Sequence, residues 1–360
     1  MCIRDRLNGV EIFPNVLRCP FNGNVEDLPR FKDGIWWIQD AASQIPCNIL
    51  LSKIKKNFFK PIHSLKVIDM CCAPGGKTAQ LLDNNLKIEC VEKSKSRSRI
   101  FKKNMKKVHV FDGVALTKFI YWIKNINKKK ITEVDAQNKL EKFRKMNKYF
   151  LYPSFDTIAG SGKNGAIVHY RAKKNNCRII NNKDIFLCDS GGQYKYGTTD
   201  VTRTICFSKP KPYIRDVFTK VLKGHIAVAN TNLKKDNTGK KIDKRARKFL
   251  KKSNLDYAHG TGHGVGFFLN VHEGPQSITK INTVKIKEGM ILSNEPGYYK
   301  ENKFGIRIEN LVYVKRKSKN LFFENLTMAP IEKDLIDFKL LNKAEKSYLF
   351  KYHLEVYSKI

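Results

Sequence analysis

Two aspartates, Asp189 and Asp200, are the first residues in this sequence whose type and spacing suggest chemistry. They lie eleven positions apart, on either side of the glycine pair Gly191-Gly192. Carboxylates that frame a turn in this way are typical ligands of a hard divalent cation. Asp, Ser, Gly and Thr are equally common in turns and caps for backbone reasons alone. Two aspartates by themselves therefore leave a metal site and a structural turn both open.

Three later residues favour the metal site. His263 lies in HGTGHGVG, Glu295 in LSNEPGYY and Glu309 in GIRIEN, each in or beside a β-like run with glycine nearby. With the two aspartates they make four carboxylates and one imidazole. A set so rich in oxygen suits a pair of Mn2+-like ions better than a thiolate zinc site. The residues thus predict a centre for two divalent metal ions.

The two aspartates need a strand, a turn and a second strand to bring them together. Residues 185–187 are apolar, residues 190–192 are a turn signal, and residues 201–205 are rich in β-formers. A hairpin of this kind would place both carboxylates at one edge. Apolar spacing also predicts helices over 111–127, 133–146, 211–231 and 243–251.

Five segments resemble, in order, the aminopeptidase P family of Xaa-Pro aminopeptidases. They are SFDTIAGSGKNGAIVHY (154–170), DSGGQYKYGTTDVTRT (189–204), HGTGHGVGFFLNVHEGP (259–275), NEPGYY (294–299) and FGIRIEN (304–310). The resemblance begins near His109 and runs to the C-terminus, where residues 324–360 resemble the family's C-terminal extension. It implies an α+β pita-bread fold, with a dinuclear site in a central β-structure flanked by helices.

The resemblance also implies which residues hold the metal ions. Asp200 and Glu309 would bridge the two ions, and Asp189 would complete the ligands of one of them. His263 and Glu295 would complete the ligands of the other. Glu295 would in addition serve as general base towards the nucleophile, a hydroxide that bridges the ions.

Three further residues match family positions around the substrate. His169 in VHY and His272 in NVHEGP match histidines that contact substrate and stabilise the developing oxyanion or the leaving nitrogen. Either histidine alone could equally be structural. Arg307 lies two residues before Glu309, so on a strand both side chains would point to the same face. From there Arg307 could orient a ligand carboxylate. His259 is left undecided. The implied substrate is a peptide with proline at the second position, whose bond to proline lacks an N–H.

Residues 7–105 have a different pattern. Residues 67–70 are typical of a buried strand, CCAPGGKT (71–78) is a glycine-rich loop, and a helical run begins at Ala79. The next strand, residues 88–91, ends at Glu92. A strand, a glycine turn and a helix make a nucleotide-type cradle, because glycine lets the backbone approach a ligand closely. A single PGG loop is also an ordinary structural turn.

The segments GIWWIQDAASQIP (34–46), VIDMCCAPGGKTAQLL (67–82) and IECVEKSKSRSRIFKKN (88–104) resemble the Sun family of RNA cytosine-5 methyltransferases. This resemblance implies S-adenosylmethionine held by Ala73, Gly75, Gly76, Lys77 and Glu92. The family's later Pro-Cys and Thr-Cys segments, which supply its catalytic cysteines, do not follow. We therefore expect a truncated, partial α/β Rossmann-like segment over 1–105, joined near 103–109 to a pita-bread catalytic domain over 106–360.

The amino-acid composition indicates which classes of binding partner and which cellular setting to expect. Lys and Arg total 69 against 33 Asp and Glu, a formal net charge of +36. Such a charge attracts phosphate backbones, so weak RNA binding is one reading, and solvated Lys-rich faces are the other. Nine cysteines without a CxxC pair indicate a reducing, cytoplasmic setting. No apolar run is long enough for a membrane span or a secretion signal. The sequence leaves a homodimer open.

Three functions remain in view. The first is a metal-dependent Xaa-Pro aminopeptidase, favoured by all five ligand positions and both histidines. The second is an S-adenosylmethionine-dependent RNA cytosine-5 methyltransferase or an RNA-binding remnant, opposed by the missing catalytic cysteines. The third is a non-catalytic pita-bread binding protein, for which loss of metal ligands would be the sign. The ligands are all present, so the first reading is preferred.

Overall fold

The computed structural model describes most of the chain from residue 95 onward and short stretches before it. The described residues are 10–13, 16–18, 41–57, 66–69, 87–90, 95–127, 131–267, 270–318 and 320–360. Contacts divide the chain into two units, Met1–Lys102 and Lys103–Ile360. Within the described ranges, no helix has the length and apolar character that crossing a membrane requires.

The described residues of the first unit contain four short strands, one helix and the first residues of a longer helix that begins at Lys95. β1 (Val10–Phe13) pairs antiparallel with β2 (Val16–Arg18), and α2 spans Ala41–Asn57. β3 (Lys66–Asp69) and β4 (Lys87–Cys90) pair in parallel. These two strands agree within one residue with those expected from the sequence. A parallel pair is one part of a Rossmann-like sheet, and the described residues do not extend it.

The second unit combines short antiparallel strands with helices. The helices are α4 (Lys95–Asn125, in this unit from Lys103), α5 (Glu133–Lys145), α6 (Pro212–Ala229), α7 (Gly239–Lys251) and α8 (Lys343–Lys359). One sheet has the order β10–β7–β6, with β6 at Ile158–Ser161, β7 at Ile185–Ser190 and β10 at Val201–Cys206. A second has the order β13–β16–β17, with β13 at Ile291–Asn294, β16 at Asn310–Lys317 and β17 at Asn320–Asn325.

The remaining strands form three smaller sheets. β5 (Phe150–Pro153), β8 (Gly192–Tyr194) and β9 (Gly197–Thr198) make one of them. β11 (Gly262–His263) pairs with β12 (Ser277–Ile278), and β14 (Gly297–Lys300) pairs with β15 (Phe304–Arg307). These short strands matter because two of them hold predicted site residues: β11 contains His263, and β15 ends at Arg307.

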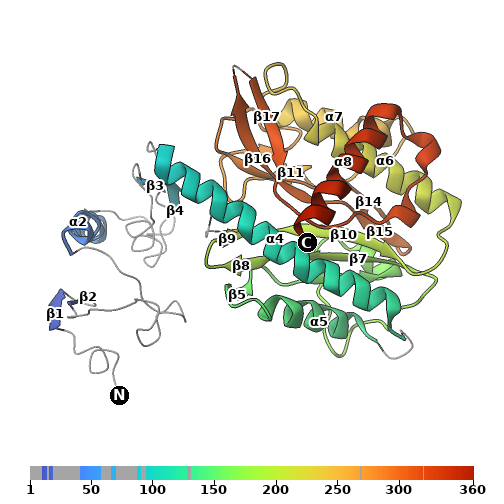
Figure 1. The fold of residues 1–360 in the computed structure, drawn as a ribbon, viewed down its shortest axis with the longest axis horizontal. Helices are drawn as coiled ribbons and strands as arrows, with labels where there is room; N and C mark the ends of the chain where they lie inside the picture. Colours follow the sequence, from blue (N-terminus) through green and yellow to red (C-terminus); the bar gives the residue numbers. More distant parts are fainter. Residues whose placement is uncertain are drawn as a thin grey trace. The chain divides into compact units, whose positions relative to one another are not determined.

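Helices cover the central strands on two sides (Figure 1). α4 and α5 contribute Phe119 and Leu140 to one apolar core, which also contains Phe186 of β7. α6 contributes Phe218 to a second core, which contains the neighbouring strand residue Ile185. Successive residues of β7 therefore enter different cores, as the alternation of side chains along a strand requires. The sheet is buried on both faces and gives the site a rigid base.

Two expected helices match the structure closely, and two begin earlier than expected. α5 and α6 lie within a few residues of the ranges 133–146 and 211–231. α5 starts with a capping box, in which the Thr132 hydroxyl accepts from the Asp135 N–H at 3.1 Å and the Asp135 carboxylate accepts from the Thr132 N–H at 2.9 Å. α7 begins at Gly239 rather than 243, and α4 at Lys95 rather than 111. α4 thus runs through the 103–109 stretch where the two families were expected to join.

The glycine pair between the two aspartates is not the turn that the sequence suggested. Gly192 already belongs to β8, and the chain reverses at residues 195–196 between β8 and β9. Gly191 is needed for a close approach instead, because a Cβ there would lie 2.0 Å from the Thr199 carbonyl oxygen. The chain can therefore loop out through β8 and β9 while β7 and β10 remain paired.

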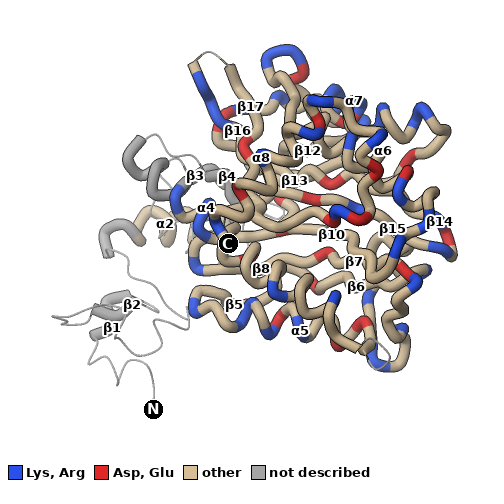
Figure 2. Tube along the Cα trace, turned by 45° about the vertical axis from the view of Figure 1, so that its right-hand side comes forward, with Lys and Arg blue, Asp and Glu red and all other residues tan. Residues whose placement is uncertain are grey.

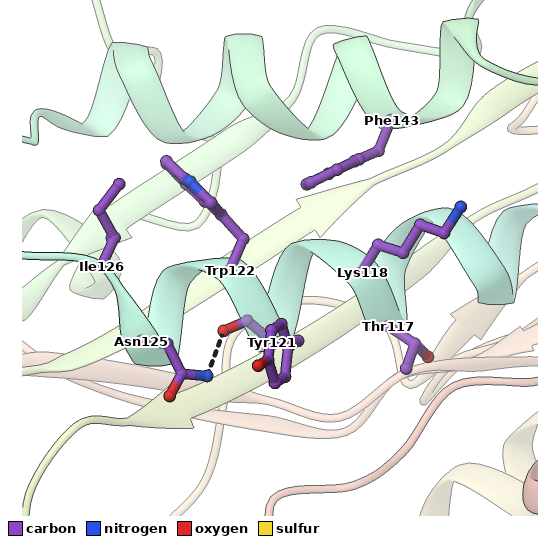
Figure 3. A pocket seen from close by; sticks show the side chains of 7 residues that line it. All are labelled: Thr117, Lys118, Tyr121, Trp122, Asn125, Ile126 and Phe143. Carbon is purple, nitrogen blue, oxygen red and sulfur yellow. Dashed lines mark hydrogen bonds between the residues drawn. The ribbon is translucent and has the colours of Figure 1, made fainter.

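A groove of about 650 Å³ lies along α4 and α5 (Figure 3). Its lining consists of residues that carry no predicted site role: Thr117, Lys118, Tyr121, Trp122, Asn125, Ile126 and Phe143. Figure 2 shows Lys and Arg distributed over helices and loops of the second unit. That distribution favours solvated basic faces over one concentrated basic block.

Candidate metal centre

Strand ends bring the five predicted metal ligands together. Asp189 is the penultimate residue of β7, and Asp200 directly precedes β10, its antiparallel partner. Glu295 directly follows β13, and Glu309 directly precedes β16. His263 belongs to β11. Because β13 and β16 also pair, the four carboxylates are fixed by two hydrogen-bonded strand pairs rather than by free loops.

Short distances make these residues one cluster. The Nε2 atom of His263 is 3.4 Å from Asp200 Oδ2 and 3.4 Å from Glu295 Oε1. Ligand atoms of Asp200, His263 and Glu309 all lie within 4.8 Å of one another, a spacing that one metal ion could span. Asp189 is close enough for its charge to act on Asp200. The structure therefore places together the residues that the sequence predicted as metal ligands.

Burial and mutual repulsion dominate the electrostatics of the cluster. Burial, followed by the charges of Asp189 and Glu295, raises the pKa of Asp200 well above its ordinary value. Burial and the same group of carboxylates, with Asp200 foremost, raise the pKa of Glu309 in the same way. Within the described part of the chain, Arg307 acts on Asp200 and His263 on Glu309, but neither outweighs burial and repulsion, so the cluster has an electrostatic preference for added positive charge.

Glu295 differs from its neighbours. Burial acts to raise its pKa, but the charges of His263, His259 and Arg307 and a hydrogen bond from Ser293 together outweigh burial. The pKa of Glu295 therefore lies below its ordinary value. This carboxylate is ionised at neutral pH and can accept a proton, which is the state that a general base needs.

Arg307 contacts the cluster through Asp189, as its place on the strand suggested. Its Nη2 donates to Asp189 Oδ2 at 2.5 Å, and its Nε donates to the Thr202 hydroxyl at 3.1 Å. The other carboxylate oxygen, Asp189 Oδ1, is buried and has no hydrogen-bond partner among the described residues. Arg307 thus fixes Asp189 while leaving one of its oxygens available to a ligand.

His272 and His169 lie at the edge of the cluster. The His272 ring centre is 4.0 Å from that of His263, in an edge-to-face arrangement. Partial burial, then the charge of His263, lowers the pKa of His272, which is still solvent-accessible, so its imidazole is neutral at neutral pH. His169 is exposed and close enough to His272 to act on its pKa. His272 therefore lies beside the predicted ligand His263, and His169 lies near His272.

His259, undecided from sequence, has partners at both ring nitrogens. Its Nδ1 lies 2.6 Å from the Gly260 carbonyl oxygen, which can only accept, so Nδ1 carries the proton. Its Nε2 then accepts from the Tyr299 hydroxyl at 2.8 Å. Tyr299 in turn accepts from Arg307 Nη1 at 2.6 Å. Sequence reasoning missed Tyr299, although it lies inside the NEPGYY segment.

Two hydroxyl residues that support the ligands were also missed. The Thr202 hydroxyl donates to Glu309 Oε2 at 2.8 Å, and the Ser293 hydroxyl donates to Glu295 Oε1 at 3.0 Å. Each lies two residues from a predicted ligand, Asp200 or Glu295. Strand alternation, the argument that identified Arg307, would have placed both on the ligand face.

The residues predicted to hold S-adenosylmethionine cannot be placed. Ala73, Gly75, Gly76, Lys77 and Glu92 lie outside the described residues. The cofactor prediction therefore remains a prediction from sequence.

A second group of possible ligand atoms occurs at Cys206, Glu332 and Asp334. Lys124 already supplies positive charge there, donating to Glu332 Oε2 at 2.7 Å and lying 3.7 Å from Asp334 Oδ2. Burial and the nearby Glu332 raise the pKa of the Cys206 thiol to about 12, so it is a neutral thiol. Lys124 thus compensates part of the negative charge of this group, and the thiol adds none.

The residues of the first cluster fit two divalent metal ions. Carboxylate oxygens with one imidazole are a donor set that Mn2+ accepts readily. The raised pKa values of Asp200 and Glu309 and the unpartnered Asp189 Oδ1 each indicate negative charge that protein groups leave uncompensated. Five donors are enough to ligate two ions if bridging residues are shared.

Comparison with known proteins identifies the family. Residues 103–316 match the model of "Metallopeptidase family M24", and residues 319–360 match the "C-terminal region of peptidase_M24". The chain belongs to metallopeptidase family M24. Its second unit is therefore the mixed α/β pita-bread domain of this family, as the sequence resemblance implied.

Two individual relatives show which kinds of protein the chain is similar to. The chain is 47% identical over 270 residues to a probable Xaa-Pro aminopeptidase P of Paracoccidioides brasiliensis, covering 71% of this chain and 44% of that protein. It is 48% identical over 265 residues to a probable Xaa-Pro aminopeptidase P of Laccaria bicolor, covering 70% of this chain and 41% of that protein. The chain therefore spans less than half the length of these M24 relatives.

Solved structures give the same family. The crystal structure of an X-prolyl aminopeptidase from Caenorhabditis elegans, described as a cytosolic enzyme with a di-nuclear active site, superposes with a TM-score of 0.68 at 30% identity. That match covers 88% of this chain and 53% of the other. A recombinant prolidase from Thermococcus sibiricus superposes with a TM-score of 0.56 at 27% identity, covering 82% of this chain and 78% of the other.

Proposed function

We propose that this M24 chain is a metal-dependent Xaa-Pro aminopeptidase, which removes the N-terminal residue from peptides with proline at the second position. The observation that carries the proposal is the buried cluster of four carboxylates and His263. Its uncompensated negative charge would be balanced by two divalent ions. The relatives' names support the proline specificity, and the cytosolic C. elegans enzyme supports a cytosolic setting.

We assign the metal ligands as the sequence predicted them. Asp200 and Glu309 would be shared between the two ions, with Asp189 on one ion and His263 and Glu295 on the other. Mn2+ is our choice of metal, because hard carboxylate oxygens dominate the donor set. Two bound divalent ions would supply Lewis-acid polarisation of the scissile carbonyl and a lowered pKa for the attacking water.

The chain's own residues would contribute the remaining steps. Glu295, ionised because its pKa is lowered, would accept the proton of the attacking water. His272, neutral because its pKa is lowered, would donate a hydrogen bond to the carbonyl oxygen as negative charge develops there. His169, exposed beside His272, would contact the leaving proline side of the peptide. Arg307 would hold Asp189 in its ligand orientation.

The test is release of the N-terminal residue from an Xaa-Pro-Xaa tripeptide by metal-stripped protein to which Mn2+ is returned. We expect metal-dependent release that EDTA abolishes. An Xaa-Ala-Xaa tripeptide tests the proline requirement, and an Xaa-Pro dipeptide separates an aminopeptidase from a prolidase. An N-acetylated Xaa-Pro-Xaa peptide tests the need for a free amine.

The outcomes separate the functions. Release from the tripeptide but much less from the dipeptide supports the proposal. Equal release from Xaa-Ala-Xaa would overturn the proline specificity, and preference for the dipeptide would make the chain a prolidase. No release by folded protein that binds two Mn2+ ions would favour a non-catalytic binding protein.

A second candidate concerns the first unit. Parallel pairing of β3 and β4 is what a partial Rossmann-like segment requires. From the sequence resemblance we infer that Ala73, Gly75, Gly76, Lys77 and Glu92 would hold S-adenosylmethionine. Because the methyltransferase cysteines are missing, we expect no methyl transfer to RNA. Equilibrium dialysis of the full chain with S-adenosylmethionine tests the site. Micromolar or tighter binding would support it, and no binding would reject it.

A further inference from the structure

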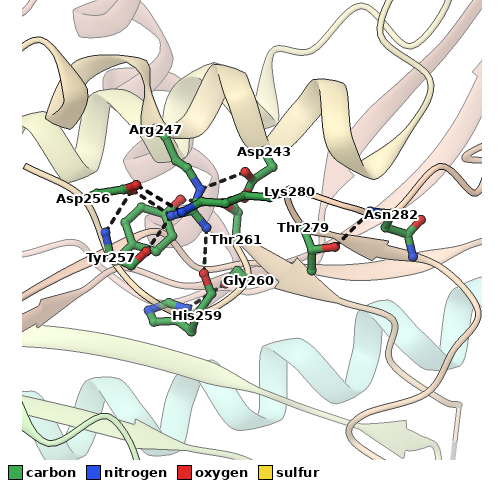
Figure 4. A network of polar contacts seen from close by, with 10 residues as sticks. All are labelled: Asp243, Arg247, Asp256, Tyr257, His259, Gly260, Thr261, Thr279, Lys280 and Asn282. Atoms are coloured by element: carbon green, nitrogen blue, oxygen red, sulfur yellow. Dashed lines mark hydrogen bonds and ion pairs between the residues drawn. The ribbon is translucent and has the colours of Figure 1, made fainter.

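Arg247 is a buried cation on α7 whose hydrogen bonds reach the loop before His263 (Figure 4). Only 2% of its surface is exposed. Its Nη1 donates to Asp256 Oδ1 at 2.7 Å and to the Tyr257 carbonyl at 2.6 Å, and its Nη2 donates to the His259 carbonyl at 2.7 Å. The guanidinium carbon also lies 3.9 Å from the centre of the Tyr257 ring. One side chain therefore fixes the backbone of residues 256–259.

Asp243, one helical turn before Arg247, connects the same helix to the end of this loop. Its Oδ2 accepts from Arg247 Nε at 2.8 Å, and its Oδ1 accepts from the Thr261 hydroxyl at 2.6 Å. The Thr261 hydroxyl has one proton and gives it to the carboxylate, so the Tyr257 hydroxyl must donate to Thr261 Oγ1. The direction of every hydrogen bond in this closed ring is thus fixed.

The far end of the loop contacts two predicted metal ligands. The Thr261 carbonyl accepts from the Glu295 N–H at 2.8 Å, and the His263 N–H donates to the Ser293 hydroxyl at 2.9 Å. A Cβ on Gly262 would lie 2.0 Å from the Ser293 carbonyl oxygen, so the loop lies directly against β13. A displacement of the loop would therefore move both His263 and Glu295.

We propose that Arg247, together with Asp243, is a positioning residue of the metal centre. It holds residues 256–261 so that His263 and Glu295 stay at ligand distance from Asp200. This inference rests on the proposed function, because it assumes that these residues bind metal. Lysine cannot replace Arg247, since one ammonium group cannot bond to Asp243 and three loop oxygens in a fixed fork.

The test compares Arg247→Lys with Arg245→Lys in the full chain. Arg245 lies on the same helix, but its side chain is 41% exposed and pairs with Asp236 at 3.0 Å, so it is a matched control. We expect Arg247→Lys to weaken Mn2+ binding by about 10- to 100-fold in calorimetry, as loss of a partner behind a metal ligand typically does. We also expect faster hydrogen exchange at the Glu295 amide in metal-free protein. Arg245→Lys should change neither.

A second variant covers the case in which Arg247→Lys does not fold. Thr261→Val keeps the shape of the loop and the Arg247–Asp243 pair but removes the hydroxyl bridge. The same two measurements apply, with a smaller loss of Mn2+ affinity expected. Folded variants that bind Mn2+ with wild-type affinity would overturn the inference.

The two proposals fail in different ways. If the wild-type chain binds no Mn2+, the proposed function fails, and exchange at the Glu295 amide still decides whether Arg247 positions this segment. If the wild-type chain binds Mn2+ and Arg247→Lys binds it equally well, only the positioning inference fails. A variant that loses thermal stability but keeps its Mn2+ affinity would show a structural role and would likewise overturn the inference.

Discussion

Asp112 and Asp189 are both buried aspartates paired with a buried arginine, and they differ in how completely their oxygens are used. Asp112 Oδ1 accepts from Arg144 Nε at 2.7 Å and from the Tyr194 hydroxyl at 2.8 Å, and its Oδ2 accepts from Arg144 Nη2 at 3.2 Å. Asp189 accepts from Arg307 through Oδ2, while its Oδ1 has no partner among the described residues.

The difference separates a structural ion pair from a ligand site. Around Asp112 the charges balance and both oxygens are satisfied, so the pair joins α4 to α5 and needs nothing more. Around Asp189 the neighbouring carboxylates outnumber the cations, and the pKa of Asp200 is raised well above its ordinary value by burial and by Asp189. A buried arginine is therefore no guide to function by itself. The remaining unsatisfied charge is the informative quantity.

Among the substitutions that test the difference between Asp112 and Asp189, we expect Asp200→Asn to have the largest effect. Removing this proposed shared ligand should reduce the proposed Xaa-Pro cleavage by more than about 100-fold, the upper end of what loss of an outer partner costs. Without metal the variant should be at least as stable as wild type, because a repelling carboxylate is gone. Activity assays measure the loss of cleavage, and urea unfolding in EDTA measures the stability of the metal-free variant. A variant that stays active would remove Asp200 from the site.

The matched substitution in the structural ion pair is Asp112→Asn. It should lower the free energy of unfolding by about 3–5 kcal/mol, because Arg144 is left buried without its counter-charge. Mn2+ stoichiometry should stay at the wild-type value, since Asp112 is not a ligand. Urea unfolding and calorimetry measure the two quantities. If Mn2+ binding were lost in folded protein, the structural pair and the metal site would not be separate.

Much of this contrast could be predicted from the sequence. The apolar run at 185–187 and the β-formers at 201–205 predicted the strand pair that holds Asp189 and Asp200. The family resemblance named His263, Glu295 and Glu309, and strand alternation gave Arg307 its contact with the ligand face. Each of these signals is local, either a period of two along a strand or a short motif.

The parts that sequence could not predict depend on contacts between distant residues. Nothing local pairs Asp112 with Arg144, 32 positions away, or directs Arg247 to the His259 carbonyl. The outward loop through β8 and β9 was hidden because Gly191 looks like a turn residue and is in fact a close-approach residue. Such features follow from tertiary packing, which overrides local preference.

The pH dependence of stability provides a third test. The raised pKa values of Asp200 and Glu309 mean that the folded, metal-free state holds these protons more tightly than the unfolded chain does. Their stabilising contribution is complete below the ordinary pKa values and is lost as pH rises through the folded-state values, by up to about 1.4 kcal/mol per pH unit for each group. Metal-free protein should therefore lose part of its stability as pH rises above the ordinary carboxyl pKa values.

Buried histidines have the opposite effect on the pH dependence of stability, and their contribution must be subtracted. Burial lowers the pKa of His225 to about 3 and lowers that of His259, so both destabilise the fold as pH falls below their ordinary value. Comparing urea unfolding of wild type with that of an Asp200→Asn/Glu309→Gln variant removes the histidine contribution, which both proteins share. The variant should lose less stability with rising pH. Equal slopes in EDTA would contradict the raised carboxyl pKa values.

The smallest effect concerns Arg203, a buried arginine on β10 whose acceptors are neutral oxygens. Its Nη1 donates to the Glu309 carbonyl at 2.6 Å, and its Nη2 donates to Asn310 Oδ1 at 2.8 Å and to the Tyr352 hydroxyl of α8 at 2.9 Å. Tyr352→Phe removes one acceptor from Nη2 and should cost about 0.5–1.5 kcal/mol in urea unfolding. Mn2+ affinity should not change, because the contact with Glu309 uses the other nitrogen. A tenfold loss of Mn2+ affinity would instead make α8 part of the support for Glu309, so that the C-terminal region would belong to the metal site rather than only to the fold.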